Sequence, residues 1–215
     1  MGTRKYEQVL RAEAAVETRR RILEAVGQRL REAPTEQPSL EKVASLAGVS
    51  RSTIYTDFGS RAGLFDAFVA DLWDRTGLEE LGEAVKSGDA REHLHQGIAA
   101  ASRMKGREIA IYRVLHAMDR LDPESAGGAV RHMEEDRKVG MKRLAAHLAE
   151  GGVLRDDVSK DEAFDVLWVL TSFEALDLLV TGRRMSVERA IDTLVTMAER
   201  AVCRPVRTRS APKKG

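Results

Sequence analysis

The chain has 215 residues and a nearly balanced charge, 35 Lys and Arg against 34 Asp and Glu, so any attraction to nucleic acid has to be local. Its single cysteine, Cys203, argues against a disulfide framework and fits a reducing cytoplasm. The first residues lack the apolar run of a signal peptide, and no apolar stretch approaches the ~20 residues that span a bilayer. We therefore expect a soluble, cytoplasmic protein with no membrane partner.

Helical periodicity dominates the chain, while aromatic residues make up only 5% and alternating β-branched residues are scarce. The sequence predicts an all-α fold. A first helix is expected over residues 14–31, with an apolar stripe formed by Ile22, Leu23, Val26 and Leu30. Residues 1–13 form an N-terminal extension that either continues this helix or frays. The basic cluster from Arg19 to Arg21 either contacts DNA or is a solvated surface.

Residues 39–65 predict two short helices joined by a glycine turn. Ser39 is placed to cap the first helix, which carries Leu40, Val43 and Leu46 inward. Ala44 allows a close helix crossing, and Gly48 can take the positive φ of a tight turn. Ser50 is placed to cap the second helix, and Ile54 packs it against the first. Gly59 and Ser60 end that helix and cap a third, over residues 61–74. Such a helix-turn-helix places its second helix in the major groove of DNA.

The second short helix presents a polar face. Steps of 100° from Ile54 put Phe58 on the same inward side, with Ser52 and Thr56 nearly opposite and Thr53 and Tyr55 on the flanks. Hydroxyl groups can bond phosphates or base edges, and Arg51 is the long donor able to fork onto guanine. A solvated polar face would have the same pattern. The turn and its packing residues, present together, favour the DNA-binding interpretation.

The same segment resembles the N-terminal domain of the tetracycline-repressor (TetR) family of bacterial regulators. The positions that match its motif are Ser39, Val43, Ala44, Ala47, Gly48, Val49, Ser50, Thr53, Tyr55, Phe58, Ser60, Arg61, Leu64 and Phe65. The resemblance implies an N-terminal three-helix DNA-binding domain followed by a larger helical domain for ligand binding and dimerisation. It implies that Tyr55, Ser39 and Arg61 grip phosphates, that Thr53 lies near the bases, and that Arg19 meets the DNA backbone. The domains expected are 1–13, 14–62, 63–203 and a disordered basic tail, 204–215.

Beyond residue 77 the chain becomes a series of amphipathic helices. We expect them near 79–87, 90–104, 107–119, 124–150, 159–181 and 186–203, with breaks at Ser87 to Asp89, Gly106, Asp122-Pro123, Gly151-Gly152 and Gly182. The helix over 186–203 has one apolar stripe, whereas 159–181 is apolar around most of its circumference and so is expected to be buried on most sides. The resemblance makes these two the dimerising pair, with an interface formed by Phe164, Leu167, Val187, Ile191, Leu194, Val195 and Ala198.

The resemblance also implies a pocket for a small effector. Its candidate lining residues, for each of which core packing is the alternative, are Met104, Ile109, Tyr112, Leu115, His116, Met118, Met133, Phe164, Asp165, Trp168 and Phe173. A lining of methionine and aromatic residues suits an apolar or amphipathic organic molecule, with His116 and Asp165 as polar anchors.

Other chemistry finds little support. His93 and His95 are two residues apart, so their imidazoles point about 200° apart on a helix and no metal site is expected. No phosphate loop, nucleophile elbow or zinc-protease motif is present in the sequence, so neither an enzyme nor a cofactor is expected. The leading hypothesis is a homodimeric repressor that binds a palindromic operator and is released by a small ligand. The alternative is a DNA-binding regulator without an effector, controlled by a protein partner.

Overall fold

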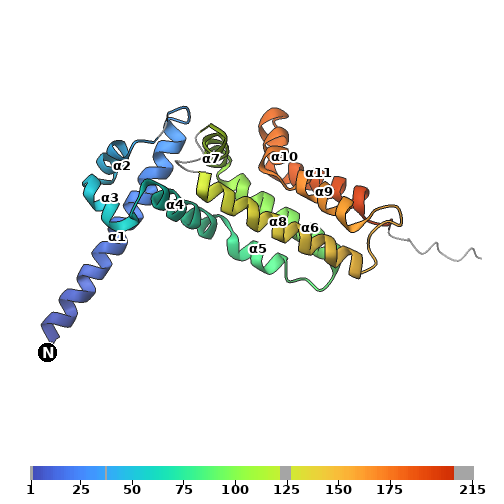
Figure 1. The fold of residues 1–215 in the computed structure, drawn as a ribbon, viewed down its shortest axis with the longest axis horizontal. Helices are drawn as coiled ribbons and strands as arrows, with labels where there is room; N and C mark the ends of the chain where they lie inside the picture. The colour runs from blue at the N-terminus through green and yellow to red at the C-terminus, as the bar shows by residue number, and fades with distance from the viewer. Residues whose placement is uncertain (1, 37, 122–126, 206–215) are drawn as a thin grey trace, which may run out of the picture. The chain divides into compact units, whose positions relative to one another are not determined.

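The computed structural model describes residues 2–36, 38–121 and 127–205, and every named element in these ranges is a helix (Figure 1). The prediction of an all-α fold is confirmed. The described residues form two compact units. Unit 1 comprises residues up to 78 together with 107–136, and unit 2 comprises 79–106 together with the residues from 137 onward. The expected functional boundary between residues 62 and 63 remains a prediction.

Unit 1 contains five helices and the first turns of a sixth. They are α1 (Gly2–Glu32), α2 (Leu40–Ala47), α3 (Arg51–Phe58), α4 (Arg61–Thr76), α7 (Ile109–Leu121) and the start of α8 (Gly127–Glu150). The predicted stripe of α1 is confirmed as core, because Ile22, Leu23, Val26 and Leu30 are all buried. Further core residues come from α4 and α7, among them Phe65, Phe68, Leu72, Ile111 and Leu115.

Helix α1 begins at Gly2, so the N-terminal extension continues the helix. Figure 1 shows its first half running on past α2 and α3. Tyr6, Val9, Leu10 and Val16 are exposed on this half.

Helix α2 buries a slightly different face from the one expected. Leu40 and Val43 are buried as predicted, but Leu46 is 44% exposed and Ala44 and Ala47 face the core instead. From Leu40, residues 44 and 47 lie within 40° of the same direction, whereas residue 46 lies about 120° away. The prediction for Leu46 was wrong because a stripe at i, i+3 and i+6 drifts off the buried face.

Unit 2 contains most of α5 (Leu78–Ala84), α6 (Ala90–Arg107) up to Gly106, the larger part of α8, and four C-terminal elements. The C-terminal elements are α9 (Lys160–Leu170), α10 (Phe173–Asp177), the π-helical turn η1 (Leu178–Gly182) and α11 (Val187–Val202). One core joins α6, α8, α9, α10 and α11 through Leu94, Ile98, Leu144, Leu148, Leu167, Leu176, Leu194 and Ala198.

The single helix expected over 159–181 is wrong, because the chain breaks at Thr171 and Ser172. Ser172 caps the new helix α10 by accepting a hydrogen bond from the Ala175 N–H. The end of α9 is held from outside: the buried Lys105 donates to the Thr171 carbonyl at 2.6 Å, and Arg137 donates to the Trp168 carbonyl at 2.7 Å. Cations at a helix C-terminus satisfy carbonyls that have no partner within the helix.

The helix break expected at Gly106 is also displaced. Helix α6 runs through Gly106 to Arg107, and the turn falls at Glu108. A Cβ on Gly106 would lie 2.7 Å from Val187 of α11, so this glycine allows a close helix approach rather than a turn. The expected break at Asp122-Pro123 and residues 206–215 of the tail expected over 204–215 lie outside the described residues. The expected disorder is wrong for Arg204, whose N–H donates to the Val153 carbonyl at 2.9 Å.

Candidate nucleic-acid interface

The turn between α2 and α3 has the conformation that its sequence predicts. Gly48 has φ 65° and ψ 37°, in the left-handed region, and its N–H bonds to the carbonyls of Ala44 and Ser45. The Val49 N–H also donates to the Ala44 carbonyl, at 3.0 Å. A side chain at Gly48 would add strain, since only glycine occupies this region without a steric penalty.

Three serines fix where α2, α3 and α4 begin. Ser39, Ser50 and Ser60 accept hydrogen bonds from the backbone N–H groups of Lys42, Thr53 and Gly63 respectively. The three predicted caps are confirmed. The phosphate contact predicted for Ser39 and the DNA contact predicted for Ser50 stay predictions, and each would use the remaining capacity of a hydroxyl that already accepts one hydrogen bond.

The outward face of α3 is as predicted from helical geometry. Ile54 and Phe58 are buried, whereas Arg51, Ser52, Tyr55 and Thr56 are exposed and Thr53 is half-buried. The hydroxyls of this face have partners within the helix: Ser50 Oγ lies 2.7 Å from Ser52 Oγ and 2.9 Å from Thr53 Oγ1, and Thr56 donates to the Ser52 carbonyl. Arg51 and Tyr55 are therefore the long side chains that extend from this surface.

The two arginines predicted to touch the DNA backbone lie near the C-terminal end of α3. The Arg19 guanidinium stacks on the Phe58 ring, 4.4 Å from its centroid, and donates to the Asp57 carbonyl at 3.2 Å. In this structure Arg19 closes the end of α3, and its predicted phosphate contact stays a prediction. Arg61 lies over the Phe65 ring at 5.7 Å, and its Nε and Nη2 atoms are buried without a hydrogen-bond partner among the described residues.

Two residues in the segment from α2 to α4 were not predicted from the sequence. Gly63 stands where any Cβ would be 2.2 Å from the Phe58 carbonyl oxygen, so α4 can follow α3 this closely only with glycine at that position. Its place three residues after the Ser60 cap is a local signal that could have revealed it. Glu41, in the first turn of α2, forms an ion pair with Arg51. Spacing alone does not reveal that contact, because the two residues belong to different helices.

The predicted pocket residues are divided between the units. In unit 1, Tyr112, Leu115, Met118 and Met133 are buried, and burial raises the pKa of Tyr112 to about 12, while Ile109 and His116 are half-buried. In unit 2, Met104 and Phe173 are buried, Trp168 is half-buried and Asp165 is exposed. Trp168 is covered on its face by Arg137, 3.5 Å from the ring centroid. Their role as a ligand lining stays a prediction.

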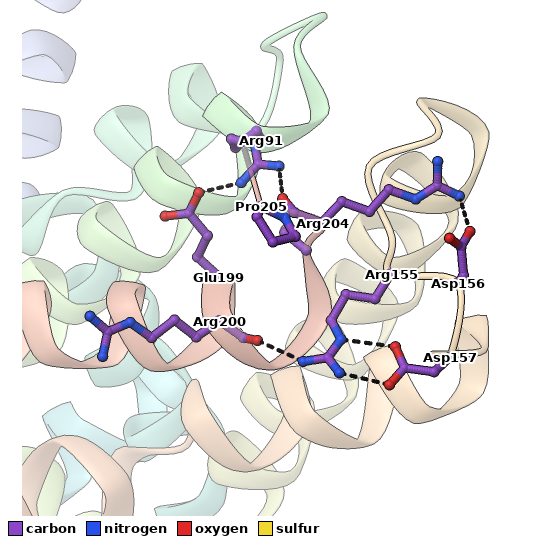
Figure 2. Close-up of a pocket in the computed structure, with 9 residues that line it drawn as sticks. Arg91, Arg155, Asp156, Asp157, Glu199, Arg200, Arg204 and Pro205 are labelled. Carbon is purple, nitrogen blue, oxygen red and sulfur yellow. Dashed lines mark hydrogen bonds and ion pairs between the residues drawn. The ribbon is translucent and has the colours of Figure 1, made fainter. Parts of the chain in front are cut away.

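A hollow of about 610 Å³ in unit 2 is lined by other residues, shown in Figure 2: Arg91, Arg155, Asp156, Asp157, Glu199, Arg200, Cys203, Arg204 and Pro205. Arg91 of α6 pairs with Glu199 and donates to the Arg204 carbonyl at 2.7 Å. Arg155 pairs with Asp157, and Arg204 pairs with Asp156. Each of these three cations has its own carboxylate, and Arg91 and Arg155 also donate to the Arg204 and Arg200 carbonyls, so these contacts hold the end of α11 against α6 and the loop before α9.

The predicted dimer interface is largely internal. Leu167, Leu194 and Ala198 are buried in the core of unit 2 and Ile191 is buried as well, so these four side chains are not exposed to a second subunit in this structure. Phe164 lies beneath Lys142 of α8 and stacks on Trp168, which turns it toward its own subunit. Val187 and Val195 are half-buried. The apolar side chains that the C-terminal elements do expose are Val169, Leu178 and Met197.

The two histidines of the rejected metal pair take different partners. His93 Nδ1 lies 3.1 Å from His147 Nδ1, and His95 Nε2 lies 3.0 Å from Glu199. No three His, Cys, Asp or Glu side chains gather as a metal site within the described ranges. In the same ranges, none of the helices combines the length and apolar character needed to cross a membrane.

Comparison with known proteins agrees with this geometry. The family model described as bacterial regulatory proteins, tetR family, matches residues 22–68, which span the last third of α1, the complete helix-turn-helix and the first half of α4. The chain carries the DNA-binding domain of the TetR family. It is accordingly a DNA-binding transcriptional regulator of the helix-turn-helix class.

Solved structures share the fold of this TetR-family chain over most of its length. A putative TetR-family regulator from Rhodococcus sp. is 19% identical with a TM-score of 0.66, covering 86% of this chain and 98% of its own. A TetR regulator from Haloarcula marismortui is 17% identical, with a TM-score of 0.68 and coverage of 87% and 99%. NalD from Pseudomonas aeruginosa, the secondary repressor of the MexAB-OprM multidrug efflux pump, is 22% identical, with a TM-score of 0.67 and coverage of 89% and 98%. Among curated protein sequences, none matches the chain significantly.

Proposed function

We propose that this TetR-family regulator is a homodimeric repressor that binds a palindromic operator and releases it when a small organic ligand binds. The observation that carries the proposal is the exposed face of α3, where Arg51, Ser52, Tyr55 and Thr56 extend from a helix whose opposite face is buried. A short helix fixed in this way can enter a major groove and contact about one half-site.

A single DNA-binding domain, which we call a head, is expected to bind DNA only weakly. Residues 1–61 hold 11 Lys and Arg against 8 Asp and Glu, a net charge of +3, which gives only modest attraction to phosphates. Two heads on one duplex, reading half-sites about 34–36 Å apart, would multiply the contacts. Dimerisation is therefore part of the proposal.

The proposed subunit contact uses the exposed apolar side chains of the C-terminal elements. Val169 of α9 is 62% exposed, Leu178 of η1 is 67% exposed and Met197 of α11 is 49% exposed. On α11, Met197 lies on the flank opposite Glu199, which is occupied by Arg91 of α6. A two-fold axis would let these residues meet their own copies, as closed dimer interfaces require.

The effector part of the proposal rests on residue chemistry. Met104, Trp168 and Phe173 in unit 2 are the types of residue that line apolar ligand sites. An apolar or amphipathic organic molecule would fit that chemistry. The repressor role follows NalD, whose name describes it as a repressor of an efflux pump.

The first test is selection of duplex DNA from a random pool by the purified protein at near-physiological salt, beside a variant with Arg51→Ala and Tyr55→Ala. We expect an inverted repeat to be enriched by the native protein and not by the variant. Recovery of unselected DNA by both would refute sequence-specific reading. With the repeat in hand, apolar ligands are screened for loss of operator binding, and failure of every ligand class would favour control by a protein partner.

A further inference from the structure

We propose that Glu41 is a positioning residue of the DNA-reading surface, which holds the Arg51 guanidinium in the orientation that reads a guanine. The inference rests on the proposed sequence-specific reading and adds a specificity-determining residue to it.

Glu41 and Arg51 meet across the helix-turn-helix. Glu41 is the second residue of α2 and Arg51 is the first residue of α3, on either side of the turn at Gly48. Glu41 Oε1 lies 2.5 Å from Arg51 Nη1. The contact therefore joins the reading helix to its supporting helix through side chains as well as through the core.

Tyr55 completes the arrangement on the other side of Arg51. The guanidinium lies over the Tyr55 ring, 6.0 Å from its centroid, one helical turn along α3. The Arg51 side chain is thus held between the Tyr55 side chain and the Glu41 carboxylate. Glu41 and Tyr55 are both exposed, as is Arg51 on the outward face of α3.

The ion pair uses one corner of the guanidinium. The Arg51 contact with Glu41 is made through Nη1, and the Tyr55 side chain is a second hydrogen-bond partner of the guanidinium, which DNA would replace. Two parallel N–H donors are what the O6 and N7 acceptors of guanine require in the major groove. A free arginine side chain loses conformational entropy when it forms two hydrogen bonds to a base. A side chain that is already held in place loses less.

A carboxylate on the DNA-facing surface is unfavourable for binding, because it repels the phosphates of the DNA backbone. The Glu41 and Arg51 side chains are 60% and 52% exposed, and ion pairs this exposed contribute little to folding. Glu41 also suits the positive end of α2, but any acid in that first turn would do so without reaching Arg51. Orientation of Arg51 is the role that explains the contact itself.

The test compares four proteins: native, Glu41→Gln, Arg51→Ala and the double variant. Each is measured on the selected operator, on operators in which each guanine of a half-site is replaced in turn, and on a random duplex. We expect Arg51→Ala to reduce discrimination at one guanine by about 10-fold or more. Glu41→Gln should reduce discrimination at the same guanine by about 3- to 10-fold, and it should add nothing in the Arg51→Ala background.

A matched control separates positioning from general charge. Glu36→Gln removes the same charge from the same head, but Glu36 pairs with Lys42 and Arg29 instead of Arg51. Both glutamine variants should bind random duplex at least as well as the native protein, which also shows that they are folded. The control should keep the native discrimination.

Three results would overturn the role of Glu41: unchanged discrimination in Glu41→Gln, an equal loss in Glu36→Gln, or an equal loss when Arg51 is already alanine. If the native protein selects no sequence at all, the proposed function fails first and this inference fails with it. Selection of DNA by the native protein therefore tests the proposed function separately, and the variants then test the role of Glu41.

Discussion

Gly63 lies so close to Phe58 that a Cβ atom on the glycine would stand 2.2 Å from the Phe58 carbonyl oxygen. The obstacle is backbone and cannot rotate away as a side chain can. The same carbonyl accepts a hydrogen bond from the Ser60 N–H at 2.8 Å. The junction between α3 and α4 therefore depends on glycine at position 63.

We expect Gly63→Ala to destabilise the DNA-binding head by about 1–3 kcal/mol or more, because the clash forces α4 away from α3. Denaturant unfolding followed by circular dichroism measures the change. The matched control is Gly140→Ala in the interior of α8, where a Cβ would meet nothing within 4 Å. Alanine there should stabilise by up to about 1 kcal/mol. Equal stability of the Gly63 variant and the native protein would show that the junction relaxes freely.

Glu108 joins three helices of unit 1 and supplies a second prediction. It accepts hydrogen bonds from Arg31 of α1 at 2.6 Å and from Arg75 of α4 at 2.8 Å, at the start of α7. Burial alone would raise the pKa of Glu108, but its two arginine partners lower it below the usual value. A carboxyl with a lowered pKa stabilises the fold above its unfolded pKa, and this stability is lost as the pH falls through the lowered value.

We expect Glu108→Gln to lower the free energy of unfolding by about 1–3 kcal/mol at pH 7, because two guanidinium groups lose a charged partner. The difference from the native protein should shrink as the pH falls from about 4.5 through the lowered pKa of Glu108, because the unfolded chain takes up its proton first and the folded carboxyl is protonated only below the lowered value. Denaturant titrations of both proteins at several pH values measure this. Glu83→Gln is the control, because Glu83 is 68% exposed and pairs only with Lys86 among the described residues. A constant difference down to pH 3 would contradict the assigned ion pairs.

The sequence predicted what depends on a few neighbouring residues. The caps at Ser39, Ser50 and Ser60 and the left-handed Gly48 act within four residues of their partners, so their pattern sufficed. The break at Thr171 is different, because Lys105 and Arg137 on distant helices satisfy the carbonyls that it frees. Periodicity could not reveal a break that is stabilised from outside the helix.

The interface residues show the same limit. The apolar stripe of α11 was correctly identified, but periodicity does not say whether a stripe is covered by its own chain or by a partner. Leu194 and Ala198 are covered within unit 2. Glu41 was missed for a related reason, since its contact with Arg51 joins two helices and has no signature in spacing.

The pair formed by His93 and His147 makes the stability of unit 2 dependent on pH. Burial lowers the pKa of His93 below its usual value, and the neighbouring His147 lowers it further. The folded protein thus binds fewer protons than the unfolded chain just below pH 6.5. This part of the stability is complete above about pH 6.5 and is lost as the pH falls toward the lowered value.

We expect His93→Gln to weaken this loss between about pH 7 and pH 5, since glutamine does not titrate and can still bond His147. Thermal unfolding at half-unit pH steps measures the slope. His132→Gln is the control, because His132 is exposed on α8 and should leave the slope unchanged. A native slope retained in the His93 variant would assign the dependence to another group.

The subunit contact gives the last prediction. Met197 and Val169 are exposed on α11 and α9, so an arginine at either position can stay in water in the monomer. In the proposed dimer it would place a charge in an apolar contact, next to the same charge from the partner. We expect Met197→Arg and Val169→Arg to shift the protein toward monomers, measured by light scattering coupled to size-exclusion chromatography, while keeping native helicity. Operator affinity should fall in both variants, because a monomer contacts only one half-site.

Two further substitutions separate this contact from the core. Val85→Arg changes an exposed apolar residue of unit 2 away from the proposed contact and should leave the dimer intact. Leu194→Arg should unfold the protein instead of dissociating it, because Leu194 is only 2% exposed and lies within the core. A folded monomer from Leu194→Arg would place the contact on the buried stripe after all. Intact dimers from both exposed-site variants would move it away from α9 and α11, because a charged pair inside a closed apolar contact costs several-fold more than the same pair in water.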